Sequence, residues 1–159
     1  MNKKCIVSIV ITFALMIMSI SCKSEKAKEE DCANNLTNLY KGVCTYIALF
    51  GGARSSTPLD GTGEIKGSEL WVKLCTDPTD VLEQDNAGKD AEILRCPVKG
   101  DGNGPDYRGP RNGWSKARKY LACDNDGNHK KGGYALTKSG TVVKLEGEEW
   151  LEALEETVK

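Results

Sequence analysis

The chain has 159 residues, with 22 Lys and Arg against 23 Asp and Glu and a net charge of −1 at pH 7. This length allows one ordinary domain, and the charge balance excludes broad nucleic-acid binding, which needs a basic face to neutralise phosphates. A single His excludes a multi-His metal centre and leaves His-based catalysis to one residue.

The N-terminus has the pattern of an export signal. Residues 1–4 form a short basic segment with two lysines, and residues 5–20 are almost wholly apolar and uncharged but shorter than the roughly 20 residues of a spanning helix. The stretch Ser19-Ile20-Ser21-Cys22 places small residues before a Cys and resembles the lipobox of bacterial lipoproteins. That resemblance implies removal of residues 1–21, a diacylglyceryl thioether on Cys22, and a location on a bacterial membrane facing the periplasm or the cell exterior. An uncleaved anchor and a plain signal with a chance Cys are the alternatives.

The remaining chain divides into a charged segment and a domain. Residues 22–31 are charged and nearly free of apolar side chains, so we expect a flexible tether. Residues 32–159 carry the apolar side chains and form the predicted domain.

Apolar periodicity predicts the elements of this domain in chain order. Spacings of three and four from Cys32 to Phe50 predict an amphipathic helix, and the glycine-rich residues 51–67 predict a loop. A second short helix opens at Ser68 and places Trp71 on its apolar side.

Shorter alternating runs then predict strands. The predicted strands are Ala91–Cys96, Ala117–Cys123, Gly133–Thr137 and Thr141–Leu145, with a loop at Lys99–Pro110 and a terminal helix at Glu148–Val158. The expected fold class is α+β: an N-terminal amphipathic helix packed on a small antiparallel sheet of three or four strands, with a C-terminal helix.

Four short motifs resemble bacterial type II secretion pseudopilin-like proteins. Cys32-Ala-Asn-Asn-Leu36 is similar to their Cys-x-Asn-Asn-Leu segment, and Leu94-Arg-Cys-Pro97 to their Phe-Arg-Cys-Pro strand. Tyr107-Arg-Gly-Pro110 stands where they have a Tyr-containing strand. His129 followed after nine residues by Ser139-Gly140 is similar to their closing hairpin motif, a His, nine residues and Asp-Gly, with Ser in place of Asp.

The resemblance implies the globular head of such a protein. Pseudopilins begin with a prepilin signal and a long apolar helix, and this chain has an export signal and a tether instead. We therefore expect a membrane-anchored, non-enzymatic assembly or docking component whose partners are secretion or pilus subunits. The alternative is a stand-alone surface or periplasmic ligand-binding lipoprotein. An enzyme is not expected, because the chain lacks a recognisable acid–base or nucleophile constellation.

The cysteines of the exported part suggest disulfides, since export leads to an oxidising compartment. We favour a bond between Cys96 and Cys123, which both end predicted strands of one sheet, and a second between Cys44 and Cys75 on apolar helix faces. A metal or redox site is the functional alternative, although no pair has the Cys-x-x-Cys spacing.

Hard oxygen side chains at alternate positions suggest a calcium loop, formed by Asp124, Asp126 and Asn128. The same residue types are ordinary turn formers, and the EF-hand spacing is absent. A weaker cluster of the same kind is Asp101, Asn103 and Asp106.

Two further side chains are candidates for function. We expect His129 to cap a turn rather than to act as a general base. Trp114 lies in a polar loop and is either a partner contact or folded back on the core, whereas Trp71 and Trp150 are expected in the core.

Overall fold

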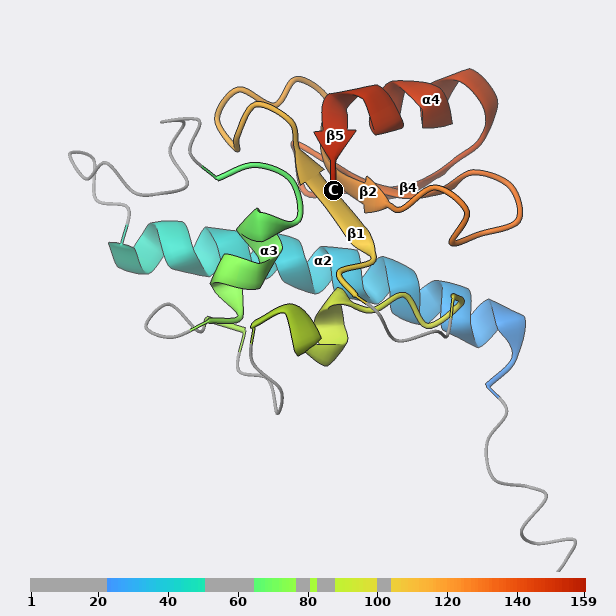
Figure 1. Ribbon diagram of the computed structural model, residues 1–159, viewed down its shortest axis with the longest axis horizontal. Coiled ribbons are helices and arrows are strands. Elements are labelled where there is room, and N and C mark those ends of the chain that lie inside the picture. Colours follow the sequence, from blue (N-terminus) through green and yellow to red (C-terminus); the bar gives the residue numbers. More distant parts are fainter. Residues whose placement is uncertain (1–22, 51–64, 77–80, 83–87, 100–103) are drawn as a thin grey trace, which may run out of the picture.

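The computed structural model describes residues 23–50, 65–76, 81–82, 88–99 and 104–159 (Figure 1). Its long helix α2 (Glu25–Phe50) lies along one face of a five-stranded antiparallel sheet, and helix α4 (Gly147–Glu156) covers the other face. This arrangement confirms an α+β fold with an N-terminal helix, an antiparallel sheet and a C-terminal helix. No helix among the described residues is both long enough and apolar enough to cross a membrane.

The sheet has five strands, rather than the three or four predicted. Its strands are β1 (Tyr107–Pro110), β2 (Tyr120–Asp124), β3 (Gly133–Thr137), β4 (Val142–Leu145) and β5 (Thr157–Val158), in the spatial order β4-β3-β2-β1-β5. Strand β5 has only two residues, too few for an alternating pattern, and it pairs with β1 after α4 has crossed the sheet.

Two further predictions for this part of the chain differ from the structure. The predicted strand Ala91–Cys96 is the short 3-10 helix η2 (Glu92–Leu94), which ends just before Cys96-Pro97. Strand β1 lies within the predicted Lys99–Pro110 loop, where Tyr107 and Arg108 pair with Asp124 and Cys123 of β2.

Helix α2 begins inside the stretch predicted as a flexible tether. Ser24 Oγ accepts the backbone N–H of Ala27 at 3.2 Å, which satisfies one of the open N–H groups at the helix start. The Glu29 carboxylate then pairs with the Lys144 ammonium of β4 at 2.9 Å. Residues 25–31 are therefore helical, and this charged segment lies against the sheet.

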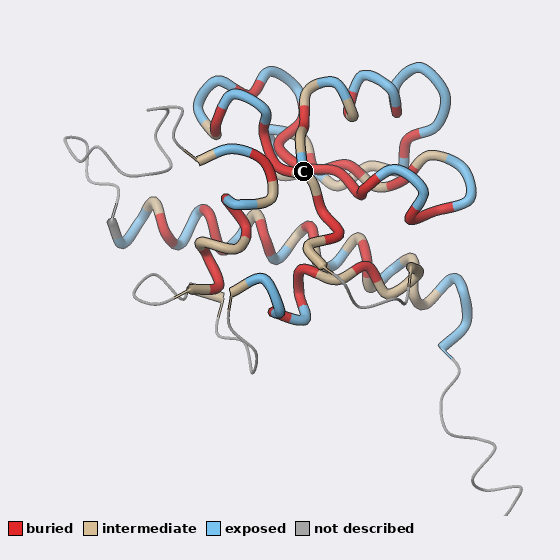
Figure 2. The backbone as a smooth tube through the Cα atoms, in the orientation of Figure 1, coloured by how far each residue is buried: buried red, intermediate tan, exposed pale blue. Residues whose placement is uncertain are grey.

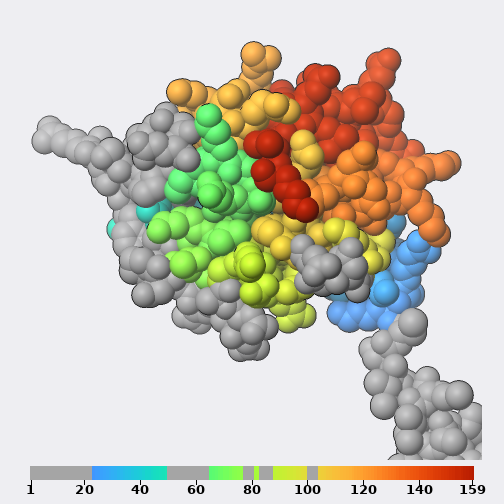
Figure 3. Space-filling view, viewed as in Figure 1, coloured from blue at the N-terminus to red at the C-terminus, as the bar shows by residue number. Residues whose placement is uncertain are grey.

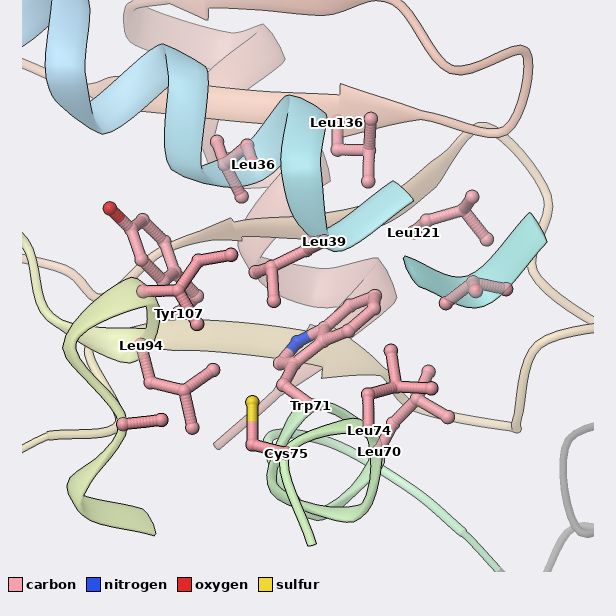
Figure 4. Packing of buried hydrophobic residues seen from close by; sticks show 14 of the residues in the cluster. Leu36, Leu39, Leu70, Trp71, Leu74, Cys75, Leu94, Tyr107, Leu121 and Leu136 are labelled. Atoms are coloured by element: carbon pink, nitrogen blue, oxygen red, sulfur yellow. The ribbon is translucent and has the colours of Figure 1, made fainter. Parts of the chain in front are cut away.

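The main core fills the space between α2 and the sheet (Figure 2). Leu36 and Leu39 of α2 meet Trp71 of helix α3 (Glu69–Leu74) and Leu136 of β3, all fully buried (Figure 4). Trp71 Nε1 donates to the Arg108 carbonyl at 3.1 Å, so the indole also fixes β1. As expected, this Trp belongs to the core.

A smaller core lies under α4. Trp150 and Ala153 are buried there with Tyr120 and Cys123 of β2. Trp150 is thus also a core residue, as expected.

The C-terminal residues lie beside the segment that precedes α3 on the molecular surface (Figure 3). Gly67 has a φ of 60°, and a Cβ at this position would lie 2.7 Å from the Lys159 carbonyl oxygen. Only glycine fits this close approach without strain.

Candidate metal centre

Four buried side chains from distant parts of the chain converge between α2 and the sheet. They are Cys32 of α2, Cys96 just after η2, Asp124 at the end of β2 and His129 in the turn before β3. Their sulfur, nitrogen and oxygen atoms all lie within 4.8 Å of one another. The exposed fractions of these residues range from 0% for Cys32 and Asp124 to 7% for His129.

The contacts are centred on one nitrogen of the histidine ring. His129 Nε2 lies 3.5 Å from Cys32 Sγ, 3.7 Å from Cys96 Sγ and 3.1 Å from Asp124 Oδ2. The two sulfurs are 3.7 Å apart, and Cys32 Sγ is 3.0 Å from Asp124 Oδ1. We call these four side chains the donor cluster.

Helix α2 places Cys32 because this residue shares the buried stripe with Leu36 and Leu39. The Tyr107 hydroxyl lies 3.4 Å from Cys32 Sγ, within donating distance. Asn35, one helical turn along, lies with its Nδ2 3.3 Å from the same hydroxyl. The thiol is therefore held from the helix side and from strand β1.

Asp106 positions Cys96. Its carboxylate is almost completely buried, and Oδ2 accepts the backbone N–H of Cys96 at 2.9 Å. The Lys99 ammonium pairs with Oδ1 at 3.0 Å and balances the buried charge. The bend at Cys96-Pro97 is thereby fixed to the start of β1.

The Asp124–His129 turn is fixed to the same residue. The Asp106 carbonyl accepts the backbone N–H of Asn125 and the side-chain Nδ2 of Asn128, both at 2.9 Å. Within the site, Asp124 Oδ2 also accepts the backbone N–H of Tyr134 at 2.7 Å. This bond orients the carboxylate so that Oδ1 faces the Cys32 sulfur.

The buried groups hold their protons unequally. Burial opposes the positive charge of His129, but hydrogen bonds with Asp124 and Cys96 outweigh it and raise its pKa to about 10. The hydrogen bond with Cys32 lowers the pKa of Cys96 to about 5, against the effect of burial. The same bond and burial raise the pKa of Cys32. These shifts favour a charged His129 ring next to one negative charge on the Cys32–Cys96 pair.

The cluster does not have the geometry of a Cys-His-Asp catalytic triad. A triad places the carboxylate on one ring nitrogen and the nucleophile on the other. Here the carboxylate and both sulfurs approach Nε2, while Nδ1 is buried with no hydrogen-bond partner among the described residues. One N–H cannot serve three acceptors, whereas one cation at the centre can bind all four groups.

The predicted disulfide pairs are not formed, because none of the five described cysteines is in a disulfide. Cys96 lies beside Cys32, on the α2 side of the sheet. Cys123 lies on the α4 side, with its Sγ 3.0 Å from Thr157 Oγ1. Cys44 is exposed and Cys75 is buried in the main core.

The three oxygen side chains of the predicted calcium loop point to different partners. Asp124 belongs to the donor cluster, Asn128 donates to the Asp106 carbonyl, and Asp126 Oδ1 accepts from Trp150 Nε1 at 3.4 Å. Of the weaker cluster, Asp106 is the anchor described above, and residues 101 and 103 lie outside the described residues.

The remaining residues predicted as functional lie in different parts of the structure. His129 is a member of the cluster rather than a simple turn cap. Trp114 is partly buried and packs near Tyr40, with ring centroids 6.1 Å apart, so its ring faces α2. Cys22 lies outside the described residues.

Cys32 was not predicted as a site residue from the sequence, and Cys96 was not predicted to lie beside His129. A metal site is usually recognised in a sequence by two ligands a few residues apart. Here only Asp124 and His129 are close in sequence, and their spacing is not a typical one. Cys32 and Cys96 are 64 residues apart.

No family model, curated protein or solved structure matches this chain.

Proposed function

We propose that this chain is an exported, non-enzymatic domain that binds one zinc ion through the donor cluster. The convergence of two sulfurs, one imidazole nitrogen and one carboxylate on a buried point supports this proposal. Buried thiolates and carboxylates are costly unless a cation neutralises them, and a divalent ion would do so here.

The spacing of the two sulfurs and the ring nitrogen fits tetrahedral zinc. Bonds of about 2.3 Å to sulfur and about 2.05 Å to nitrogen place two sulfurs about 3.8 Å apart, and sulfur and nitrogen about 3.6 Å apart. The cluster has 3.7 Å between the sulfurs, and 3.5 and 3.7 Å from sulfur to nitrogen. A mixed sulfur, nitrogen and oxygen set suits zinc, while calcium and magnesium take oxygen ligands.

The ion would have a structural role. Four protein ligands complete a tetrahedral shell, whereas a catalytic zinc keeps one position for water or substrate. With all four residues buried, the ion would link α2, the segment after η2 and the sheet. It would act like a disulfide that joins three segments.

We place this domain on a bacterial membrane through a lipid on Cys22. Helix α2 begins only three positions later, so the head would lie close to the membrane surface. We propose that the domain docks there on secretion or pilus subunits. This part of the proposal rests on the sequence motifs. Binding of a ligand by a stand-alone lipoprotein is the alternative.

The metal proposal is tested on the purified full chain by elemental analysis and cobalt substitution. We expect one zinc per chain, and thiolate-to-cobalt charge-transfer bands in the cobalt form. Cys32→Ser should lose most of the metal, and Cys123→Ser, on the other side of the sheet, should retain it. A chain that takes up neither zinc nor cobalt would contradict the proposal.

The docking proposal needs a separate measurement. A gentle-detergent pull-down from the native host, with and without a chelator, would be read by mass spectrometry. Recovery of secretion or pilus subunits supports docking. A protein recovered without them favours the stand-alone alternative.

A further inference from the structure

We propose that Cys32 and Cys96 form a redox-active pair that a small hydroperoxide oxidises to a disulfide when the metal is absent. The thiol chemistry rests on the distance between the two sulfurs and on the cavity that Cys96 lines. Its regulatory consequence, that metal binding and oxidation exclude each other, rests on the proposed zinc site.

The two sulfurs are close enough to bond after a small movement. They are 3.7 Å apart and belong to segments on either side of one buried site. Closing them to a bond of about 2.05 Å requires each sulfur to move by about 0.8 Å. Rotation of the two side chains and a slight shift of the Cys96-Pro97 bend can supply this movement.

Cys96 lines a cavity on the α2 side of the sheet. A cavity of about 520 Å³ lies between α2 and the segment around η2, and Cys96 contributes to its wall while Cys32 does not. Its other lining residues include Asn34, Asn35, Asn38 and Arg95. Because these side chains are polar, water or a small polar hydroperoxide can occupy the cavity. Cys96 is therefore the attacking sulfur, and Cys32 is the resolving one.

The chemistry takes place in two balanced steps. Cys96, once deprotonated, attacks the hydroxyl oxygen of the hydroperoxide, the O–O bond breaks, and Cys96 sulfenic acid and an alkoxide or hydroxide are formed. That anion takes a proton from solvent and leaves as an alcohol or as water. Cys32 then attacks the sulfenic sulfur, an S–S bond forms, and the hydroxyl leaves as water with the Cys32 proton. The hydroperoxide is the oxidant and takes up two electrons, and a second thiol compound can reverse the reaction.

Metal and disulfide exclude each other because they use the same two sulfurs. Zinc has no redox chemistry of its own and covers both thiolates. Oxidation removes two of four ligands and would release the ion. In either state α2 remains linked to the segment after η2.

The experiment compares chelator-treated and zinc-loaded full chain during exposure to hydrogen peroxide. Disulfides are mapped by mass spectrometry of proteolytic peptides without reduction. We expect the metal-free chain to give the Cys32–Cys96 crosslink, and zinc to slow its formation at least about tenfold, because the bound ion covers both thiolates. Dimedone should trap sulfenic acid on Cys96 in Cys32→Ser, and the Cys123→Ser control should form the crosslink like the parent chain.

The outcomes separate the two proposals. If the metal-free chain, while folded by circular dichroism, forms no Cys32–Cys96 crosslink or crosslinks other cysteines instead, the redox pair is refuted. If the crosslink forms but the chain takes up no zinc, the proposed function fails and the redox pair stands. If zinc binds and leaves the oxidation rate unchanged, the mutual exclusion is wrong.

Discussion

The backbone N–H of Cys96 donates to the buried carboxylate of Asp106 at 2.9 Å. The carbonyl of the same Asp106 accepts from Asn125 and Asn128 in the turn that carries His129. One residue just before β1 thus positions both loops that supply the site. Groups that orient metal ligands in this way contribute to affinity without contacting the ion.

Asp106→Asn should therefore weaken zinc binding by about 10- to 100-fold, because the amide cannot serve both the Cys96 N–H and the Lys99 ammonium. Affinity is measured by competition with a chromophoric chelator. Asp90→Asn is the control, since this exposed carboxylate pairs with Arg95 at 3.6 Å and touches no site residue. Equal affinities of the two variants would contradict the role of Asp106.

Zinc binding should become tighter as pH rises from about 6 to about 9 and should release protons. His129, with its pKa raised to about 10, and Cys32, with its pKa also raised, are protonated in the metal-free protein at pH 7. Cys96, with a pKa of about 5, is already deprotonated. Binding needs all three without protons, so it should release about two protons per zinc at neutral pH. Calorimetry in buffers of different ionisation enthalpy measures this number, and a value near zero would exclude these ligands.

In the metal-free protein, the pKa shifts of His129 and Cys96 make stability depend on pH in opposite directions. The raised pKa of His129 stabilises the fold fully below the unfolded value of 6.5, and this contribution is lost as pH rises through about 10. The lowered pKa of Cys96 contributes fully above the unfolded value of 9.0, and this contribution is lost as pH falls through about 5. Urea unfolding of chelator-treated protein should thus show less stability at about pH 4.5 than at pH 7, and the difference should shrink in a folded Cys96→Ala variant. An unchanged pH profile in that variant would show that Cys96 is not the group responsible.

Leu36→Ala should lower the free energy of unfolding by about 2–5 kcal/mol, because it leaves a cavity between α2 and the sheet. Leu151→Ala is the matched control: this leucine is 59% exposed on α4 and its truncation should change stability by less than about 0.5 kcal/mol. Both are measured by urea unfolding of the zinc-loaded chain. Similar losses in the two variants would mean that α2 is not packed as described.

Arg108→Lys should loosen the junction between α4 and β5. The Arg108 guanidinium donates to the carbonyls of Leu154 and Thr157 at 3.1 and 2.9 Å and to Thr157 Oγ1 at 3.1 Å. A lysine cannot reproduce this planar set of donors, and a loss of about 1–2 kcal/mol is expected. Hydrogen exchange should rise at the last turn of α4 and at β5, whereas Arg118→Lys, an exposed substitution, should leave it unchanged. Unchanged exchange in Arg108→Lys would contradict the contribution of this side chain.

The elements predicted best were those with a regular apolar period. Leu36 and Leu39 stand on the predicted stripe of α2, and Gly133–Thr137 forms β3 with the predicted bounds. The apolar pattern did not predict strands β1 and β5. Both are short, and each pairs with residues far away in the sequence. Tertiary contacts decide such strands more than local propensity does.

The start of α2 was missed for a related reason. A charged segment is typical of a solvated tether, but Glu29 finds Lys144 and the Tyr134 hydroxyl on the sheet. The sequence contains these charges without showing that they meet. The site residues are equally inconspicuous in the sequence, because each of them also fits an ordinary structural role. Only the fold brings Cys32 next to Cys96 and His129.

The distribution of the site residues along the chain has a consequence for where the ion is acquired. Cys32 and Cys96 are separated by 64 residues, and Cys96 and His129 by 33, so an unfolded chain does not hold these three ligands in one place. A chain that crosses a membrane before folding would arrive without metal. The zinc would therefore be drawn from the compartment in which the domain folds, and the supply of zinc and peroxide there would decide which of the two crosslinks each newly made copy receives.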